Sequence, residues 1–166
     1  MKKNKGFSLI ELLIVVAIIL IIAAIAIPNL LRSRIAANEA SATASLRTLN
    51  TAEVTYASTY NSGFTSTLNQ LETPTPAGTQ PSWSAADLVD PILSGVQSGA
   101  TSSFTKNGFI FTYGINGGTY PQIATYSVNA DPMARGSSGQ RSFFSDQSAV
   151  VRANATAQAT NTDSPI

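Results

Sequence analysis

An uninterrupted apolar segment near the N-terminus constrains this chain more than any other feature. No charged residue occurs from Leu12 to Ile27, and three of the five residues that open the chain are lysines. As an α-helix, residues 7–27 would extend about 30 Å, which is enough to cross the hydrocarbon of a bilayer. Because basic residues stay on the cytoplasmic side, we expect the rest of the chain outside the cytoplasm, although Arg32 and Arg34 weaken this asymmetry.

Glu11 places a carboxylate near the start of the apolar segment. At the centre of a bilayer an acidic residue costs about 3 kcal/mol, and ionisable residues within such segments usually have a partner. Two simpler interpretations are a secretory signal peptide cleaved near residues 23–26 and a plain one-pass anchor. Neither gives the chain a reason to carry the carboxylate. Glu11 therefore requires a positive charge nearby.

The sequence KKNKGFSLIELLIVVAIILIIAAIAIP, from Lys2 to Pro28, resembles the leader and N-terminal helix of type IV pilins and their relatives. It combines a short basic leader ending at Gly6, Phe7 as the first residue after it, Glu11 as the fifth, and an apolar run closed by Pro28. The resemblance implies that a membrane-embedded prepilin peptidase cleaves between Gly6 and Phe7 and methylates the new amine.

The resemblance also implies partners and a location. It predicts a single-pass inner-membrane precursor that then forms an extracellular or periplasmic filament, a homopolymer joined through its N-terminal helices with the help of inner-membrane assembly machinery. We expect no specific nucleic-acid partner. Once the leader lysines are removed, acidic residues outnumber basic ones by two, and affinity for phosphates requires clustered Lys and Arg.

Cleavage after Gly6 would supply the charge that Glu11 lacks, because it creates an α-amine four residues away. In a filament the Phe7 amine of one subunit could pair with Glu11 of its neighbour, so that a slipped subunit would bury an unpaired charge. Glu11 would then set the assembly register, which we state as a hypothesis. Pro28 lacks a backbone donor, and we expect it to kink the helix rather than end it, because helix-compatible residues resume directly afterward.

An amphipathic helix is expected beyond Pro28, ending near Tyr60 with Gly63 as a terminator. Its apolar face is defined by residues at helical spacings, namely Leu31, Ile35, Ala42, Leu46, Leu49, Tyr56 and Tyr60. Five charged residues on the same helix are interpreted mainly as a solvated face, with contacts between subunits as the alternative: Arg32, Arg34, Glu39, Arg47 and Glu53.

The C-terminal half is predicted to form four antiparallel strands. Alternating residues indicate strands at 108–115 and 123–128, with a strand pair at 141–152, and a hairpin turn at 116–118. Residues 73–81 are expected to form a loop, and residues 85–96 a short helix broken near Pro91. Residues 153–166 have little to bury and are interpreted as a flexible exposed tail.

Together these elements predict an α+β fold, a long N-terminal helix packed on a C-terminal antiparallel sheet, like the globular head that the resemblance implies. We divide the chain into a leader (1–6), a membrane-spanning or filament-core half-helix (7–28), an amphipathic half-helix (29–63), a globular head (64–152) and a tail (153–166).

The composition argues against catalysis. The chain contains neither His nor Cys, which removes the commonest general base, the Ser-His-Asp and Cys-His arrangements, and thiolate metal sites. We therefore expect no enzyme, no catalytic residue and no cofactor. No metal site is expected either, since the acidic residues of the C-terminal half are scattered: Asp87, Asp90, Asp131 and Asp146. The function predicted is a structural pilus subunit, with a pseudopilin of a type II secretion system as the alternative.

Overall fold

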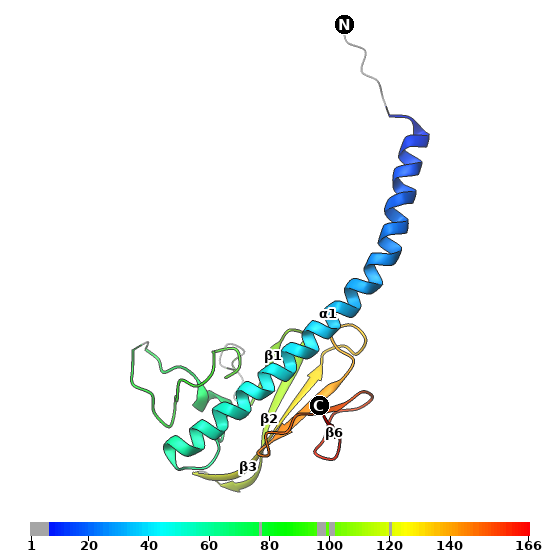
Figure 1. Ribbon diagram of the computed structural model, residues 1–166. Coiled ribbons are helices and arrows are strands. Elements are labelled where there is room, and N and C mark those ends of the chain that lie inside the picture. Colours follow the sequence, from blue (N-terminus) through cyan, green and yellow to red (C-terminus); the bar gives the residue numbers. More distant parts are fainter. Residues whose placement is uncertain (1–6, 77, 96–98, 100–101, 120) are drawn as a thin grey trace. The chain divides into compact units, whose positions relative to one another are not determined.

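A computed structural model describes residues 7–76, 78–95, 99, 102–119 and 121–166 of the chain. It divides into two compact units, Met1–Arg34 and Ile35–Ile166. Helix α1 (Leu9–Tyr60) runs through both units and is followed by an antiparallel sheet (Figure 1). The fold is therefore α+β with one long N-terminal helix, as the sequence predicts. Gly6 and the rest of the expected leader lie outside the described residues.

In the described part of the first unit, α1 begins at Leu9 and the large apolar side chains are exposed. From Phe7 to Leu30 these side chains are between 45% and 84% exposed. Among the described residues, α1 is the one helix long and apolar enough to span a membrane. Helix α1 continues through Pro28, so the alternative of a helix end at this proline does not hold, and the kink stays a prediction.

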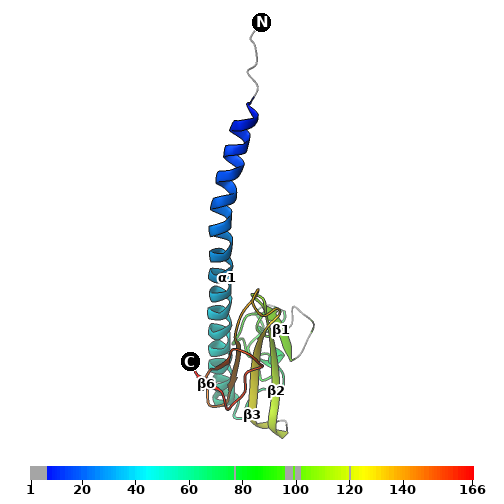
Figure 2. The same ribbon diagram turned by 90° about the vertical axis from the view of Figure 1, so that its right-hand side faces the viewer.

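In the second unit, the C-terminal half of α1 packs on one face of the sheet (Figures 1 and 2). The predicted apolar face is buried from Ala42 to Tyr56, and complete burial of a Leu side chain contributes about 2 kcal/mol. The helix ends at Tyr60 as expected. Asn61, rather than Gly63, takes the left-handed conformation directly after it, with φ of 49°. At Gly63 a Cβ would lie 2.4 Å from the carbonyl oxygen of Ile123, so glycine permits this close approach.

Within the described residues, the sheet has six strands in sequential antiparallel order. They are β1 (Ser103–Lys106), β2 (Phe109–Thr119), β3 (Gln122–Pro132), β4 (Ser142–Asp146), β5 (Arg152–Asn154) and β6 (Ser164–Pro165). The alternating aromatic residues Phe109, Phe111 and Tyr113 all point into the core. Strands β2, β3 and β4 are present as alternation predicts. The second strand expected within residues 141–152 is displaced, because β5 begins only at Arg152, and β1 and β6 are additional.

The predicted turn at 116–118 is wrong. These residues belong to β2, where two register shifts around Gly117 keep the strand paired with β3. A Cβ on Gly117 would lie 2.7 Å from the Thr125 hydroxyl, so the glycine serves an irregular strand rather than a turn. The hairpin that sequence reasoning missed joins β1 to β2 at Asn107 and Gly108, which have φ of 48° and 75°, the positive values that a tight hairpin turn requires.

Two other predictions are corrected. The described residues from 85 to 95 form a loop with a turn at 91–94 instead of a helix, and the short 3₁₀ helix η1 (Leu68–Leu71) lies earlier in the chain. The expected flexible tail is part of the fold, because β5 and β6 extend the sheet and Ala159 is buried. Residues 153–166 thus have a buried residue, Ala159, although most of them are small or polar.

Candidate functional site

The candidate site at the N-terminal end of α1 centres on Glu11. Its Oε2 accepts a hydrogen bond from the backbone N–H of Ser8 at 2.8 Å. Ser8 directly precedes the helix, so Glu11 satisfies one of the donors that a helix start leaves free. Phe7 beside it is 84% exposed. The carboxylate thus lies against the amide that follows Phe7, the residue expected to become the new N-terminus.

The electrostatic surroundings of this site are simple. Glu11 is the sole charged residue between Phe7 and Leu31. Pro28 lies within the helix and has no N–H to donate to the turn before it. The structure thus presents Glu11 and Pro28 on one exposed apolar helix, with Phe7 two residues before its start. Their predicted roles in cleavage, register and kinking stay predictions.

Glu39 corrects the expectation of a solvated charged face. It is only 7% exposed. Its carboxylate accepts hydrogen bonds from the backbone N–H groups of Gln140 and Arg141, and it pairs with the Arg141 guanidinium at 2.9 Å. Burial alone would raise the pKa of Glu39, but the bonds from Arg141 and Gln140 lower it overall. Glu39 therefore fastens α1 to the loop between β3 and β4.

Glu53 is the second correction, since it is fully buried. Its carboxylate accepts hydrogen bonds from the Thr65 backbone N–H at 2.9 Å and from the Thr65 hydroxyl at 2.6 Å. Tyr113 donates to the Thr65 carbonyl at 2.7 Å. Burial raises the pKa of Glu53 despite the bonds from Thr65 and Tyr113. Its carboxyl holds the chain reversal after α1 against the sheet.

The other charged residues of α1 differ from these two. Arg32, Arg34 and Arg47 are exposed, as the expectation of a solvated face requires. Two open grooves, of about 340 and 420 Å³, flank Arg47, Thr51 and Thr55 on the outer face of the helix. Within the part of the chain that the structure describes, no three acidic side chains gather in a group that could hold a metal ion.

The chain is similar to known proteins over part of its length. Residues 1–27 match the family described as a prokaryotic N-terminal methylation motif. The chain is 61% identical over 46 residues to the type IV wide pilus major component PilA4 of Thermus thermophilus, and 48% identical over 54 residues to the type IV major pilin protein PilA of Myxococcus xanthus.

These similarities cover 28% and 32% of this chain, and 35% and 24% of the two relatives. The chain thus aligns with about a third or less of either relative. No solved structure matches it. The head is therefore described by its own geometry alone.

Proposed function

We propose that this chain, which carries the N-terminal segment of the type IV pilin family, is a structural subunit of a type IV pilus-like filament. It would enter the inner membrane as a prepilin, be cleaved after Gly6 and N-methylated at Phe7, and polymerise through α1. One observation carries the proposal, namely the exposed apolar helix surface from Leu9 to Ile27 with a carboxylate at its N-terminal end.

An exposed apolar surface of this length needs a covering that water cannot provide. Lipid would cover it in the precursor, and the same segment of other copies would cover it in the filament. A structural subunit accounts for such a surface, because neither state requires a catalytic group. The relatives are named as pilus components, which favours a pilus over a secretion pseudopilus.

Glu11 would set the register in which neighbouring subunits assemble. In the structure its carboxylate already lies next to the amide that follows Phe7, so a new amine on Phe7 would arise within reach of it. Pairing with the amine of a neighbouring copy would neutralise both charges inside an apolar filament core. A slipped subunit would leave both unpaired, at a cost of roughly 3 to 5 kcal/mol.

The division of the chain follows from these roles. Residues 1–6 would be the leader that the prepilin peptidase reads, residues 7–28 the anchor and filament core, and residues 29–63 the support for the head. Pro28 would kink the helix between the two halves. The mature protein would leave the inner membrane for a surface filament with the help of the assembly machinery.

Fibres shed from producing cells test the function. Electron microscopy should show filaments, and intact-mass measurement of their subunit should give a chain that starts at an N-methylated Phe7. Replacing Gly6 with a bulky residue should leave the precursor uncut. A mature start near Ala26 would instead indicate an ordinary signal peptide and contradict the proposal.

A further inference from the structure

Nearly every charged side chain of the second unit has a partner within the described residues. Glu39 pairs with Arg141, Lys106 lies 3.9 Å from Asp90, and Glu53 is bound by Thr65. The remaining ones are held by hydrogen bonds to polar groups: Arg135, Arg152, Asp131, Asp146 and Asp163. The charged side chains that lack a partner in the described part of this unit therefore call for an explanation.

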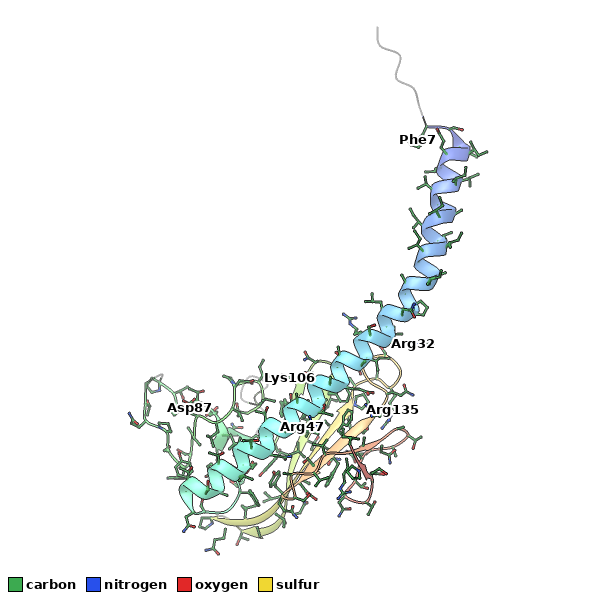
Figure 3. All side chains as sticks on the ribbon, viewed as in Figure 1. Phe7, Arg32, Arg47, Asp87, Lys106 and Arg135 are labelled. Atoms are coloured by element: carbon green, nitrogen blue, oxygen red, sulfur yellow. The ribbon has the colours of Figure 1, made fainter. Side chains whose placement is uncertain are left out.

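Three charged side chains in residues 35–166 make no hydrogen bond or ion pair that the described structure contains: Arg47, Glu72 and Asp87. Arg47 is an exposed residue of α1, whereas the two carboxylates belong to the segment between η1 and β1. Figure 3 shows Arg47 and Asp87 at separate places on this unit. The two halves of a complementary charge pair are thus present on one unit without meeting.

The backbone around Glu72 and Asp87, the acidic half of the pair, is held by hydrogen bonds. The backbone N–H of Asp87 donates to the Glu72 carbonyl at 2.7 Å, and the amides of Leu88 and Val89 both donate to the Leu71 carbonyl. These bonds bring the two acidic residues together on adjacent segments. Within the described residues, neither the Glu72 nor the Asp87 side chain has a counter-charge, and an arginine, whose planar guanidinium carries several donors, is a suitable ligand for carboxylates.

Arg47, the basic half of the pair, lies on a face of α1 that a second protein surface can approach closely. The hydroxyls of Thr48, Thr51 and Thr55 donate to the helix carbonyls four residues earlier, at 3.1, 3.0 and 2.8 Å. Their donors are therefore satisfied, and a partner that covers them leaves none of these donors unpaired. Val54 on this face is 53% exposed. Arg47 is the charged residue between the two grooves beside this face.

We propose that Arg47 of one copy of this chain pairs with the Glu72 and Asp87 carboxylates of a second copy. The contact joins two different surfaces, so each copy offers one unsatisfied half to the next and the interaction can repeat along an assembly. This inference rests on the proposed filament function and names a contact between its heads. Complementary charges across such a contact fix its register and specificity.

Disulfide crosslinking tests the contact directly, because the chain has no native cysteine. In shed fibres, Arg47→Cys combined with Glu72→Cys should give, after mild oxidation, a ladder of covalent oligomers on a non-reducing gel. Glu72 has an extended backbone with φ of −68°, which cysteine adopts without strain. The matched control combines Arg47→Cys with Asp131→Cys, another half-buried acidic position, and should give at least tenfold less ladder.

Charge variants provide a second measurement. Arg47→Glu should lower fibre yield at least threefold, and adding Glu72→Arg with Asp87→Asn should restore most of it. Asparagine tolerates the positive φ of 56° at Asp87. Fibres of normal yield from Arg47→Glu, together with no excess of ladder over the control, would overturn the pairing and leave the filament function standing. If the unaltered chain forms no fibres, both proposals fail.

Discussion

The Glu39 carboxylate and the Arg141 guanidinium are 2.9 Å apart and join α1 to the strand region 102 residues further along the chain. Neighbouring amides of the β3–β4 loop donate to the same carboxylate. Arg141 also lies over the Phe143 ring, 5.4 Å from its centroid. A single buried carboxylate thus fixes helix, loop and strand together, which makes the second unit a suitable object for stability measurements.

A fragment that begins at Asn29 should be a soluble, folded monomer. The second unit contains the entire buried core cluster, whereas the exposed apolar residues up to Ile27 would supply assembly. Circular dichroism should show a helix and a sheet, and sizing should give one chain per particle. An unfolded or aggregated fragment would show that the N-terminal half-helix is required for folding.

In that fragment, Glu39→Gln should lower the free energy of unfolding by about 2 kcal/mol at pH 7, because it weakens charge-assisted hydrogen bonds. The pKa of Glu39 is lowered in the folded state. Its contribution is therefore present above the ordinary pKa of 4.5 and is lost as the pH falls through the lowered value. Urea unfolding at several pH values measures this. Arg47→Gln, which removes a charge without a partner, should change stability by less than about 0.5 kcal/mol.

Glu53→Gln should raise the stability of the fragment, which is the opposite of the effect expected for Glu39→Gln. Burial raises the pKa of Glu53, so its stabilising protonated form is present below pH 4.5 and is lost as the pH rises through the raised value. Glutamine keeps the shape without the charge and should raise the free energy of unfolding by about 1 kcal/mol at pH 7.

The gain from Glu53→Gln should disappear below about pH 4, where the glutamate of the unfolded chain is also largely protonated. A loss of stability at neutral pH would mean that the ionised carboxylate is the form that Thr65 binds. Thr65→Val, which removes the hydroxyl donor, should be destabilising at both pH values.

The sequence was sufficient to predict an element of secondary structure where its apolar pattern is repeated over many residues. The helix from the apolar run to Tyr60 and the strand carrying Phe109, Phe111 and Tyr113 follow from such patterns, because burying one face of an element requires apolar residues at its structural period. The N-terminal candidate residues could be named for the same reason, since they belong to one contiguous motif.

Long-range pairing could not be predicted in this way. Glu39 and Glu53 look like residues of a solvated face, and their burial depends on Arg141 and Thr65, which no local pattern connects to them. The prediction of a flexible tail failed similarly, since the pairing of β5 with β6 and the bond from the Asn129 side chain to the carbonyl of the buried Ala159 are also long-range contacts. One local signal was present, however. Asn107 and Gly108 between two apolar stretches are a strong hairpin indicator.

Glu11 offers a way to separate membrane insertion from assembly. Its carboxylate lies among exposed apolar side chains and accepts one backbone hydrogen bond. Insertion should become easier when the charge is removed, because an ionised carboxylate is costly in the hydrocarbon. Assembly should become harder, because the amine that cleavage creates on Phe7 would lose its counter-charge. The two effects of one substitution therefore have opposite signs.

Glu11→Gln should consequently leave cleaved, membrane-held protein at normal or higher levels and reduce fibre yield well over tenfold. Loss of one member of a buried pair costs roughly 3 to 5 kcal/mol, which acts at each subunit addition. Glutamine preserves the length of the side chain, so the loss would report on charge rather than packing. Quantifying subunit in membrane and shed-fibre fractions, in cells without the unaltered chain, measures both effects. Normal fibre yield from Glu11→Gln would refute the register role of this carboxylate.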